Sequence, residues 1–125
     1  MAFKIAIPPD ADHRSIRTAI NEFYKTKAVE KIGPRAKRLA EEHKLEYRQL
    51  DFRTMSKRWG SCTPDNKIIL NPLAVKLPYQ LIDYLIIHEL THTKVKDHSK
   101  RFWSELAKHV SNWKELDERI AEMKF

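Results

Sequence analysis

A continuous apolar segment in the second half of the chain constrains the fold more than any other feature of the sequence. The seven residues 81–87 (LIDYLII) contain a single charge, and Pro78 precedes them at a position suited to the first turn of a helix. A helix that is hydrophobic almost all round is buried in the core of a domain. The sequence therefore predicts a central, buried helix over residues 78–93.

The same helix ends in the motif His88-Glu89-Leu90-Thr91-His92. Histidines four residues apart lie one above the other on one helix face, so their imidazoles can bind one metal ion. Buried histidines need polar partners, because an unpaired buried polar group costs on the order of 1–3 kcal/mol. Ordinary core histidines are the alternative interpretation. The motif in this setting favours a metal site with His88 and His92 as ligands.

A catalytic zinc site needs a third protein ligand and one position left open for water. His98 lies ten residues after the first histidine of the motif, behind a short polar segment, 93–97, that can turn the chain back toward the metal. The spacing equals that of the metzincin pattern H-E-x-x-H-x-x-G-x-x-H, although Val95 occupies the glycine position. His98 is therefore the expected third ligand, and Glu105 and His109 on the following helix are the alternatives.

The predicted chemistry is zinc-dependent hydrolysis of peptide bonds in a protein or peptide substrate. Three neutral imidazoles leave the zinc charge undiluted, so the pKa of a water in the open position falls toward about 7. Glu89 would accept a proton from this water and later pass it to the leaving amine. Tyr79, Tyr84 and Arg58 are candidates for stabilising the oxyanion. Hydrolysis of a non-peptide amide is one alternative, and a zinc-containing binding module for protein or nucleic acid is another.

The remaining pattern predicts one α+β domain over residues 1–125, with N-terminal helices, a small sheet of about three mostly antiparallel strands, and C-terminal helices. Residues 1–9 are expected as a short strand or an arm. Gly33-Pro34 should divide the N-terminal helical region into two helices, one from about residue 12 to 32 and one ending near residue 43 or 44. Further helices are expected at 73–76, 99–109 and 113–123.

Strands are predicted at 47–53, 56–62 and 67–70, and Gly60 marks a bulge or a close approach of the backbone. The last of these strands ends just before the metal helix. Its free edge is therefore expected to accept an extended peptide as an added strand.

The net charge of +7 is concentrated in the first half of the chain, where residues 1–58 contain 14 Lys and Arg against 8 Asp and Glu. Acidic residues alternate with these cations, which favours a solvated surface over a nucleic-acid partner. The basic positions are Lys25, Lys27, Lys31, Arg35, Lys37 and Arg38.

The cellular setting is predicted from cysteine usage and from hydropathy. A single cysteine, Cys62, excludes an internal disulfide and indicates a reducing cytoplasm. Neither a membrane span nor a signal peptide is expected, because apolar runs are short and Pro8-Pro9 interrupts the N-terminus.

Four ordered motifs resemble the YgjP-like metallopeptidase family, which is akin to the WLM and SprT-like metallopeptidases. They are KRWGSC at 57–62, IILN at 68–71, IDYLIIHELTH at 82–92 and HSKRFW at 98–103. The likeness extends from about residue 14 to residue 113. It implies a compact zinc metallopeptidase domain with a zincin-type active-site helix, His88, His92 and His98 as ligands and Glu89 as catalytic base.

The resemblance also bears on the cleft and on possible partners. It implies that the motifs containing Trp59 and Phe102-Trp103 form the scaffold around the cleft, with Cys62 in a structural role. WLM and SprT-like relatives act on proteins attached to DNA, which keeps nucleic acid open as a partner.

Overall fold

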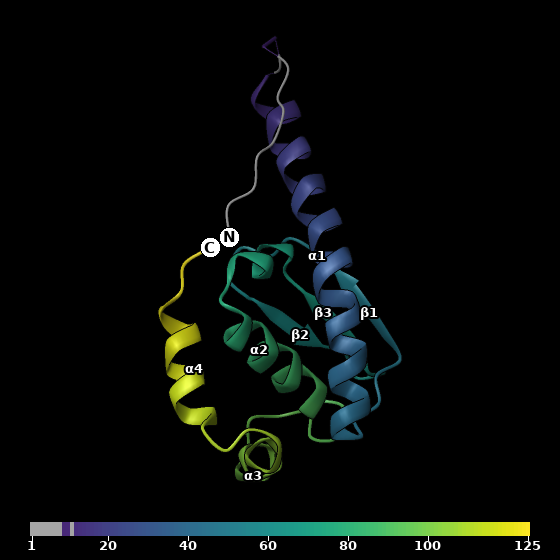
Figure 1. Cartoon of the computed structure of the whole chain (residues 1–125), viewed down its shortest axis with the longest axis vertical. Coiled ribbons are helices and arrows are strands. Elements are labelled where there is room, and N and C mark those ends of the chain that lie inside the picture. Colours follow the sequence, from purple (N-terminus) through teal and green to yellow (C-terminus); the bar gives the residue numbers. More distant parts are fainter. Residues whose placement is uncertain (1–8, 11) are drawn as a thin grey trace.

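The computed structural model describes residues 9–10 and 12–125, and its helices and strands form an α+β fold, as predicted (Figure 1). Residues 1–8 of the expected N-terminal strand or arm lie outside the described residues. No helix within the described part of the chain is long and apolar enough to cross a membrane. The elements in order are α1 (His13–His43), β1 (Gln49–Phe52), β2 (Gly60–Cys62), β3 (Lys67–Leu70), the 3-10 helix η1 (Pro72–Lys76), α2 (Tyr79–Thr91), α3 (Lys100–His109) and α4 (Trp113–Glu122).

The sheet is mixed, with the strand order β1-β3-β2. β2 and β3 form an antiparallel hairpin, in whose turn the Asn66 N–H donates to the Thr63 carbonyl at 3.0 Å. β1 and β3 pair in parallel, so the expectation of mostly antiparallel pairing is wrong for this pair. The reason is that the chain leaves β1 at one edge of the sheet and forms β2 at the opposite edge. The hairpin then returns it to the middle of the sheet as β3. The central strand is therefore β3, and the edges are β1 and β2.

A buried asparagine holds the crossing segment between β1 and β2 in place. Asn71 is fully buried, and its Nδ2 donates to the carbonyls of Met55 at 2.8 Å and Arg58 at 3.0 Å. Its backbone N–H donates to the Trp59 carbonyl at 2.8 Å. These bonds fix the approach to β2 against the end of β3, next to the start of η1.

α1 is a single helix of 31 residues that continues through Gly33 and Pro34, where the sequence predicted a break. A proline inside a helix removes a hydrogen bond and crowds the carbonyl four residues earlier, here that of Glu30. Glu30 is exposed, so water can hydrate this carbonyl. Both halves of the helix bury the same face against the core, and this packing outweighs the local cost. The buried residues on that face are Ala28, Ile32, Ala36, Leu39 and Ala40.

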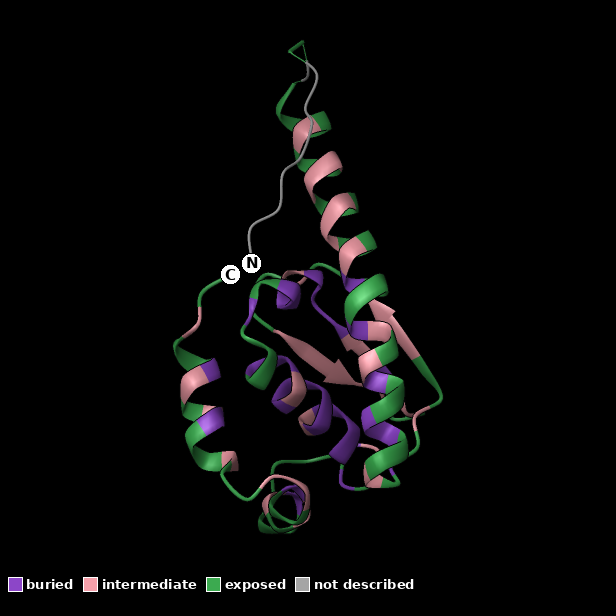
Figure 2. Ribbon diagram, viewed as in Figure 1, coloured by how far each residue is buried: buried purple, intermediate pink, exposed green. Residues whose placement is uncertain are grey.

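α2 forms the centre of the molecule, in contact with α1, α3, α4 and the edge strand β2. Nine of its 13 residues are buried, which confirms the central helix that the apolar segment predicts (Figure 2). The N–H groups of Leu81 and Ile82 donate to the Pro78 carbonyl, so the helix begins where the proline indicates. The N-terminal part of α1 extends beyond this body (Figure 1).

Candidate metal centre and cleft

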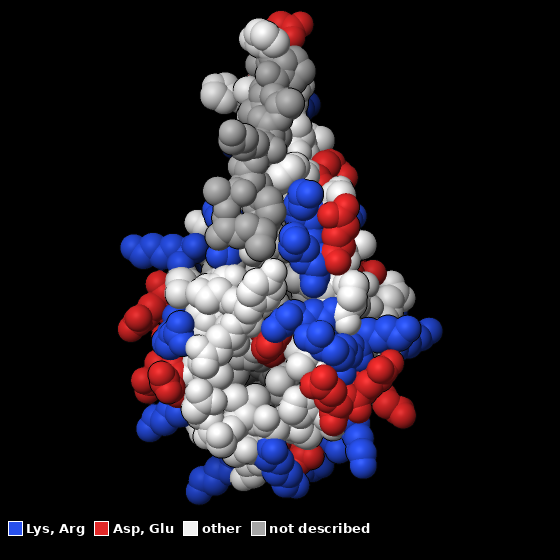
Figure 3. Space-filling view, viewed as in Figure 1, with Lys and Arg blue, Asp and Glu red and all other residues white. Residues whose placement is uncertain are grey.

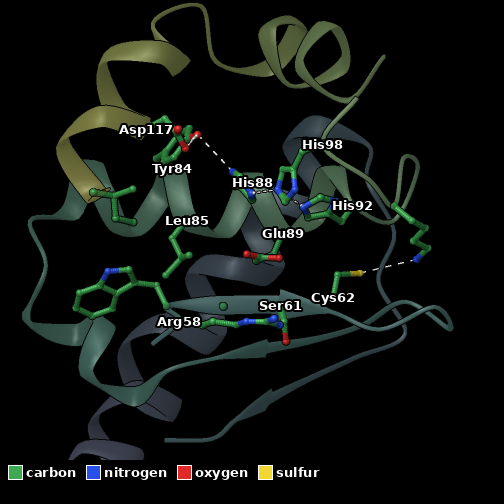
Figure 4. A pocket seen from close by; sticks show the side chains of 14 residues that line it. Arg58, Ser61, Cys62, Tyr84, Leu85, His88, Glu89, His92, His98 and Asp117 are labelled. Carbon is green, nitrogen blue, oxygen red and sulfur yellow. Dashed lines mark hydrogen bonds between the residues drawn. The ribbon is translucent and has the colours of Figure 1, made fainter. Parts of the chain in front are cut away.

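Three histidine side chains converge at the C-terminal end of α2 (Figure 4). His88 and His92 share one face of α2, and His98 comes from the loop that leads to α3. The Nε2 atom of His98 lies 3.3 Å from Nε2 of His88 and 3.2 Å from Nε2 of His92. One ligand atom from each of the three residues lies within 4.8 Å of the others. The structure thus brings together the three residues that the sequence proposed as ligands.

The two alternative ligands lie elsewhere. Glu105 pairs with Lys94 at 3.6 Å and with Lys108 at 3.0 Å. The Nδ1 atom of His109 lies 3.2 Å from Nδ1 of His43, at the junction of the C-terminal ends of α3 and α1. Neither residue belongs to the histidine cluster found in the described part of the chain.

Hydrogen bonds at the rear of the two helical imidazoles determine which nitrogen faces the cluster. Nδ1 of His92 donates to the Val95 carbonyl at 2.9 Å. Nδ1 of His88 lies 3.3 Å from the Tyr84 hydroxyl, which itself donates to Oδ1 of Asp117 at 2.8 Å. Protons on both Nδ1 atoms leave both Nε2 lone pairs facing inward, which is the arrangement that metal-binding histidines adopt.

Val95 occupies the position of the metzincin glycine without needing its backbone freedom. Among the described non-glycine residues, only Lys44 and Asn66 have positive φ. The Val95 N–H donates to the Thr91 carbonyl at 3.1 Å, and the Val95 side chain is buried. This turn returns the chain toward the cluster and supplies the carbonyl that orients His92.

The nitrogen atoms suit a tetrahedral cation. Burial lowers the pKa of His88 to about 3, with a further contribution from its two histidine neighbours. Burial also lowers the pKa of His92. Both rings are therefore neutral and available as ligands at pH 7. Zn–N bonds of about 2.0–2.1 Å at tetrahedral angles place two ligand nitrogens about 3.3 Å apart, which matches the separations from His98.

An aromatic side chain supports all three imidazoles from the α3 side. Phe102 is fully buried and stacks on His92, with ring centroids 4.3 Å apart and planes 15° apart. Its ring also lies 5.0 Å from the rings of His88 and His98. Trp103 packs against Phe102 with centroids 4.9 Å apart. This packing restricts the ring orientations of the cluster.

Glu89 lies beside the histidine cluster and faces the cleft (Figure 4). It is 5% exposed, and burial raises its pKa to about 8, while the charge of Arg58 acts in the opposite direction. β2 approaches Glu89 closely at Gly60, where an added Cβ would lie 3.0 Å from Cγ of Glu89 and 2.9 Å from Cδ2 of Leu70. The predicted close approach at Gly60 is thus confirmed.

A cleft of about 480 Å³ runs between β2 and α2 beneath the cluster. Figure 4 shows Tyr84 and Leu85 toward one end and Cys62 and His92 toward the other. Among the described residues, the free edge beside this cleft belongs to β2, because β3 is paired on both sides. The expectation that the strand at 67–70 offers a free edge is therefore wrong, and β2 takes that place.

The three oxyanion candidates differ in position. Tyr79 is half exposed and lies outside the cleft. The guanidinium carbon of Arg35 lies over its ring, 4.8 Å from the ring centroid of Tyr79. Tyr84 lines the cleft but is engaged with Asp117. Arg58 lines the cleft and points along β2 (Figure 4), so it alone remains available.

Cys62 lines the cleft wall but lies outside the three-histidine group. Burial raises the pKa of its thiol, which lies 3.9 Å from Nζ of Lys96. Lys96 in turn donates to the Thr63 carbonyl at 3.1 Å. The thiol is therefore protonated at neutral pH, consistent with a structural role in the wall.

Sequence reasoning missed the contribution of α4 to the cleft. Asp117 and Ile120 line its wall, although the sequence indicated only a helix at 113–123. Asp117 is half-buried and lies three residues before the buried Ile120, on the same face of α4. No local pattern identifies its partner, because Tyr84 is 33 residues away.

Solved structures share this fold, among them the crystal structures of the metallopeptidase zymogens abylysin of Pyrococcus abyssi and jannalysin of Methanocaldococcus jannaschii. Abylysin is 23% identical, with a TM-score of 0.62 over 71% of this chain and 90% of that chain. Jannalysin is 22% identical, with a TM-score of 0.61 over 73% of this chain and 94% of that chain.

At the level of sequence, a search of curated proteins finds no match. The family model described as "YgjP-like, metallopeptidase domain" matches residues 2–123, which is almost the whole chain and more than the motifs alone indicate. The chain belongs to the YgjP-like metallopeptidase family.

Proposed function

We propose that this protein is a zinc-dependent metallopeptidase in which His88, His92 and His98 bind the metal and Glu89 is the general base. The observation that supports this most directly is the convergence of three imidazoles, in which Nε2 of His98 lies 3.3 Å from Nε2 of His88 and 3.2 Å from Nε2 of His92. The buried carboxyl of Glu89 lies beside them. Membership of a metallopeptidase family agrees with it.

The mechanism follows from the positions of the side chains. Zinc, when bound, supplies Lewis-acid activation of a water and of the scissile carbonyl. Glu89 accepts the proton of the attacking water and delivers it to the leaving amine. Burial keeps the pKa of the Glu89 carboxyl near 8 without metal, and a divalent cation nearby favours its ionised form. Arg58 at the cleft wall is the side chain placed to stabilise negative charge on the substrate.

We propose that the substrate is a protein or peptide bound in extended form along β2. The outer edge of β2 is unpaired among the described residues and borders the cleft. Main-chain hydrogen bonds to a strand edge give affinity that does not depend on sequence. Because α2 contacts α1, α3, α4 and β2, we also propose that the chain acts as one domain.

The charge distribution supports a peptidase over a nucleic-acid binding module. Lys and Arg gather along α1, with Asp and Glu beside them (Figure 3). Several of these cations are paired: Lys27 with Glu30 at 3.7 Å, and Arg38 with Glu42 at 3.8 Å. Arg35 forms a bidentate pair with Asp83 of α2. These contacts pair part of the basic charge of α1 with carboxylates of the same chain on a solvated face. A base beside the metal serves no purpose in binding alone.

Replacing Glu89 with Gln tests the proposal. Zinc content, measured by elemental analysis, should stay near one per chain, while hydrolysis of an unfolded protein such as casein should fall by about 10²–10⁴-fold. Glu105→Gln is the matched control, since Glu105 pairs with lysines away from the cluster. Full activity in Glu89→Gln would remove Glu89 as the base, and a parent protein without stoichiometric zinc would contradict the metal site.

A further inference from the structure

We propose that Asp117 and Tyr84 form a positioning relay for His88, through which α4 sets the affinity of the metal site. This inference rests on the proposed function, because His88 is one of the three ligands assigned there. Among the described contacts, Tyr84 and Asp117 reach His88 but not His92 or His98. They act through the orientation and the proton of one imidazole.

The relay is built from two helices that are distant in the sequence. Tyr84 lies one helical turn before His88 on α2 and is 2% exposed. Its hydroxyl donates to Oδ1 of Asp117 on α4 at 2.8 Å and lies 3.3 Å from Nδ1 of His88. The two rings meet nearly edge to face, with centroids 5.8 Å apart and planes 70° apart. Figure 4 shows Asp117, Tyr84 and His88 in this order along the cleft wall.

The carboxylate fixes the direction of both hydrogen bonds. An ionised carboxylate only accepts, so the Tyr84 hydroxyl must give its proton to Asp117. The hydroxyl oxygen then faces His88 as an acceptor, and Nδ1 must carry the ring proton. Nε2 is left bare, and it is the atom that lies 3.3 Å from Nε2 of His98.

Without the carboxylate the same hydroxyl can rotate. It can then donate to Nδ1 of His88, which places the ring proton on Nε2, the atom that must bind metal. The neutral ring has only one proton to distribute, so a change at Asp117 reaches the metal site without moving the ring. Outer partners of ligating histidines commonly change metal affinity by about 10–100-fold.

A second contact between α2 and α4 allows the proposed effect on His88 to be distinguished from a simple attachment of α4 to α2. Nη1 of Arg119 on α4 donates to Oε1 of Gln80 on α2 at 2.8 Å. Arg119 thus joins α4 to α2 as Asp117 does, but no contact described for it reaches a histidine. Arg119→Met is therefore the matched control for Asp117→Ala.

The first test is the dissociation constant for zinc, measured by competition with a chromophoric chelator. Tyr84→Phe and Asp117→Ala should each raise it by about 10–100-fold, and Arg119→Met should leave it unchanged. Because Asp117 acts through Tyr84, the double variant Tyr84→Phe/Asp117→Ala should bind zinc no more weakly than Tyr84→Phe alone. Thermal unfolding of each metal-free variant shows whether the fold is retained.

The second test is the tautomer of His88 in the metal-free protein, observed by ¹⁵N NMR of the imidazoles. The parent should carry the proton on Nδ1, and Asp117→Ala should gain the Nε2–H form. Asp117→Asn keeps the size of the side chain but can also offer an N–H, so it should give an intermediate population and intermediate zinc affinity. A structural role for Asp117 would leave the tautomer unchanged.

The outcomes separate the relay from the metal site itself. Unchanged zinc affinity in Tyr84→Phe and Asp117→Ala would overturn the relay and leave the proposed function standing. Equal loss in Arg119→Met would also overturn it, since tethering would then explain the effect. A parent protein that binds no zinc would remove the metal site and the relay together.

Discussion

At the scale of single residues, the site depends on a glycine without a side chain as well as on the residues that react. Gly60 allows β2 to approach the Glu89 side chain to within the distance of a single methyl group. The strand that borders the cleft and the proposed base are therefore in direct contact. A shift of the β2 backbone at Gly60 would therefore displace the Glu89 side chain.

Gly60→Ala should reduce activity while zinc binding persists. Its Cβ would lie 3.0 Å from Cγ and 3.1 Å from Oε2 of Glu89, so the carboxylate must move. We expect a fall in kcat/KM of at least about 10-fold, since displacement by about 1 Å costs up to about 10²-fold. Overpacking should lower the free energy of unfolding by about 1–3 kcal/mol.

Gly33→Ala is the control for this change. An added Cβ at Gly33 meets nothing within 4 Å, and the residue lies inside α1. Its activity should equal that of the parent. The free energy of unfolding should change by less than about 1 kcal/mol, because helix propensity favours Ala while the ring of Pro34 disfavours a Cβ on the helical residue before it. Peptidase kinetics and urea denaturation measure both effects, and full activity in Gly60→Ala would show that the contact with Glu89 is unimportant.

At the scale of elements, the sequence predicts what is periodic and local. The apolar segment 81–87 and the motif that follows it specify α2, its burial and two of the three clustered histidines. The order of the strands is not local, so the parallel pairing of β1 with β3 could not be read from the alternation of side chains. The path of α1 through Pro34 depends likewise on packing that only the folded core supplies. The same limit hid Asp117, whose partner lies on another helix.

His109, where the C-terminal end of α3 meets that of α1, should make the free energy of unfolding depend on pH. Burial, followed by the charge of His43, lowers the pKa of His109, and Nε2 of His109 is buried without a partner among the described residues. Glu105 acts in the opposite direction, and Lys94 and Lys108 act in the same direction as His43. A lowered pKa in the folded state gives stability that is present above the unfolded pKa of about 6.5 and is lost as the pH falls below it.

Replacing His109 with Gln should therefore weaken the acid sensitivity of the fold. Between pH 7 and pH 5, the parent should lose more free energy of unfolding than the variant, as measured by urea denaturation at each pH. Both proteins should be compared without metal, so that the three clustered histidines contribute equally to each. Parallel curves for the two proteins would show that His109 is as easily protonated in the folded state as in the unfolded chain.

At the scale of the whole molecule, the histidine cluster joins the central helix to the segment that leads to α3. His88 and His92 belong to the central helix, whereas His98 precedes α3, and α4 reaches the cluster through Asp117. A ligand that binds only the folded state stabilises the entire fold. Zinc should therefore stabilise the C-terminal helices together with the site.

A cytoplasmic location stays a prediction from the single cysteine.

Removing zinc with a chelator should lower the Tm, and added zinc should restore it in a concentration-dependent way. At free zinc 100-fold above its dissociation constant, the stabilisation should be about 2.7 kcal/mol. His98→Ala should show little of this dependence, because only the two histidines of α2 remain to bind the ion. If its Tm rose with zinc as steeply as that of the parent, the loop residue would not be a ligand, and α3 would be anchored to α2 by Phe102 and its packing alone.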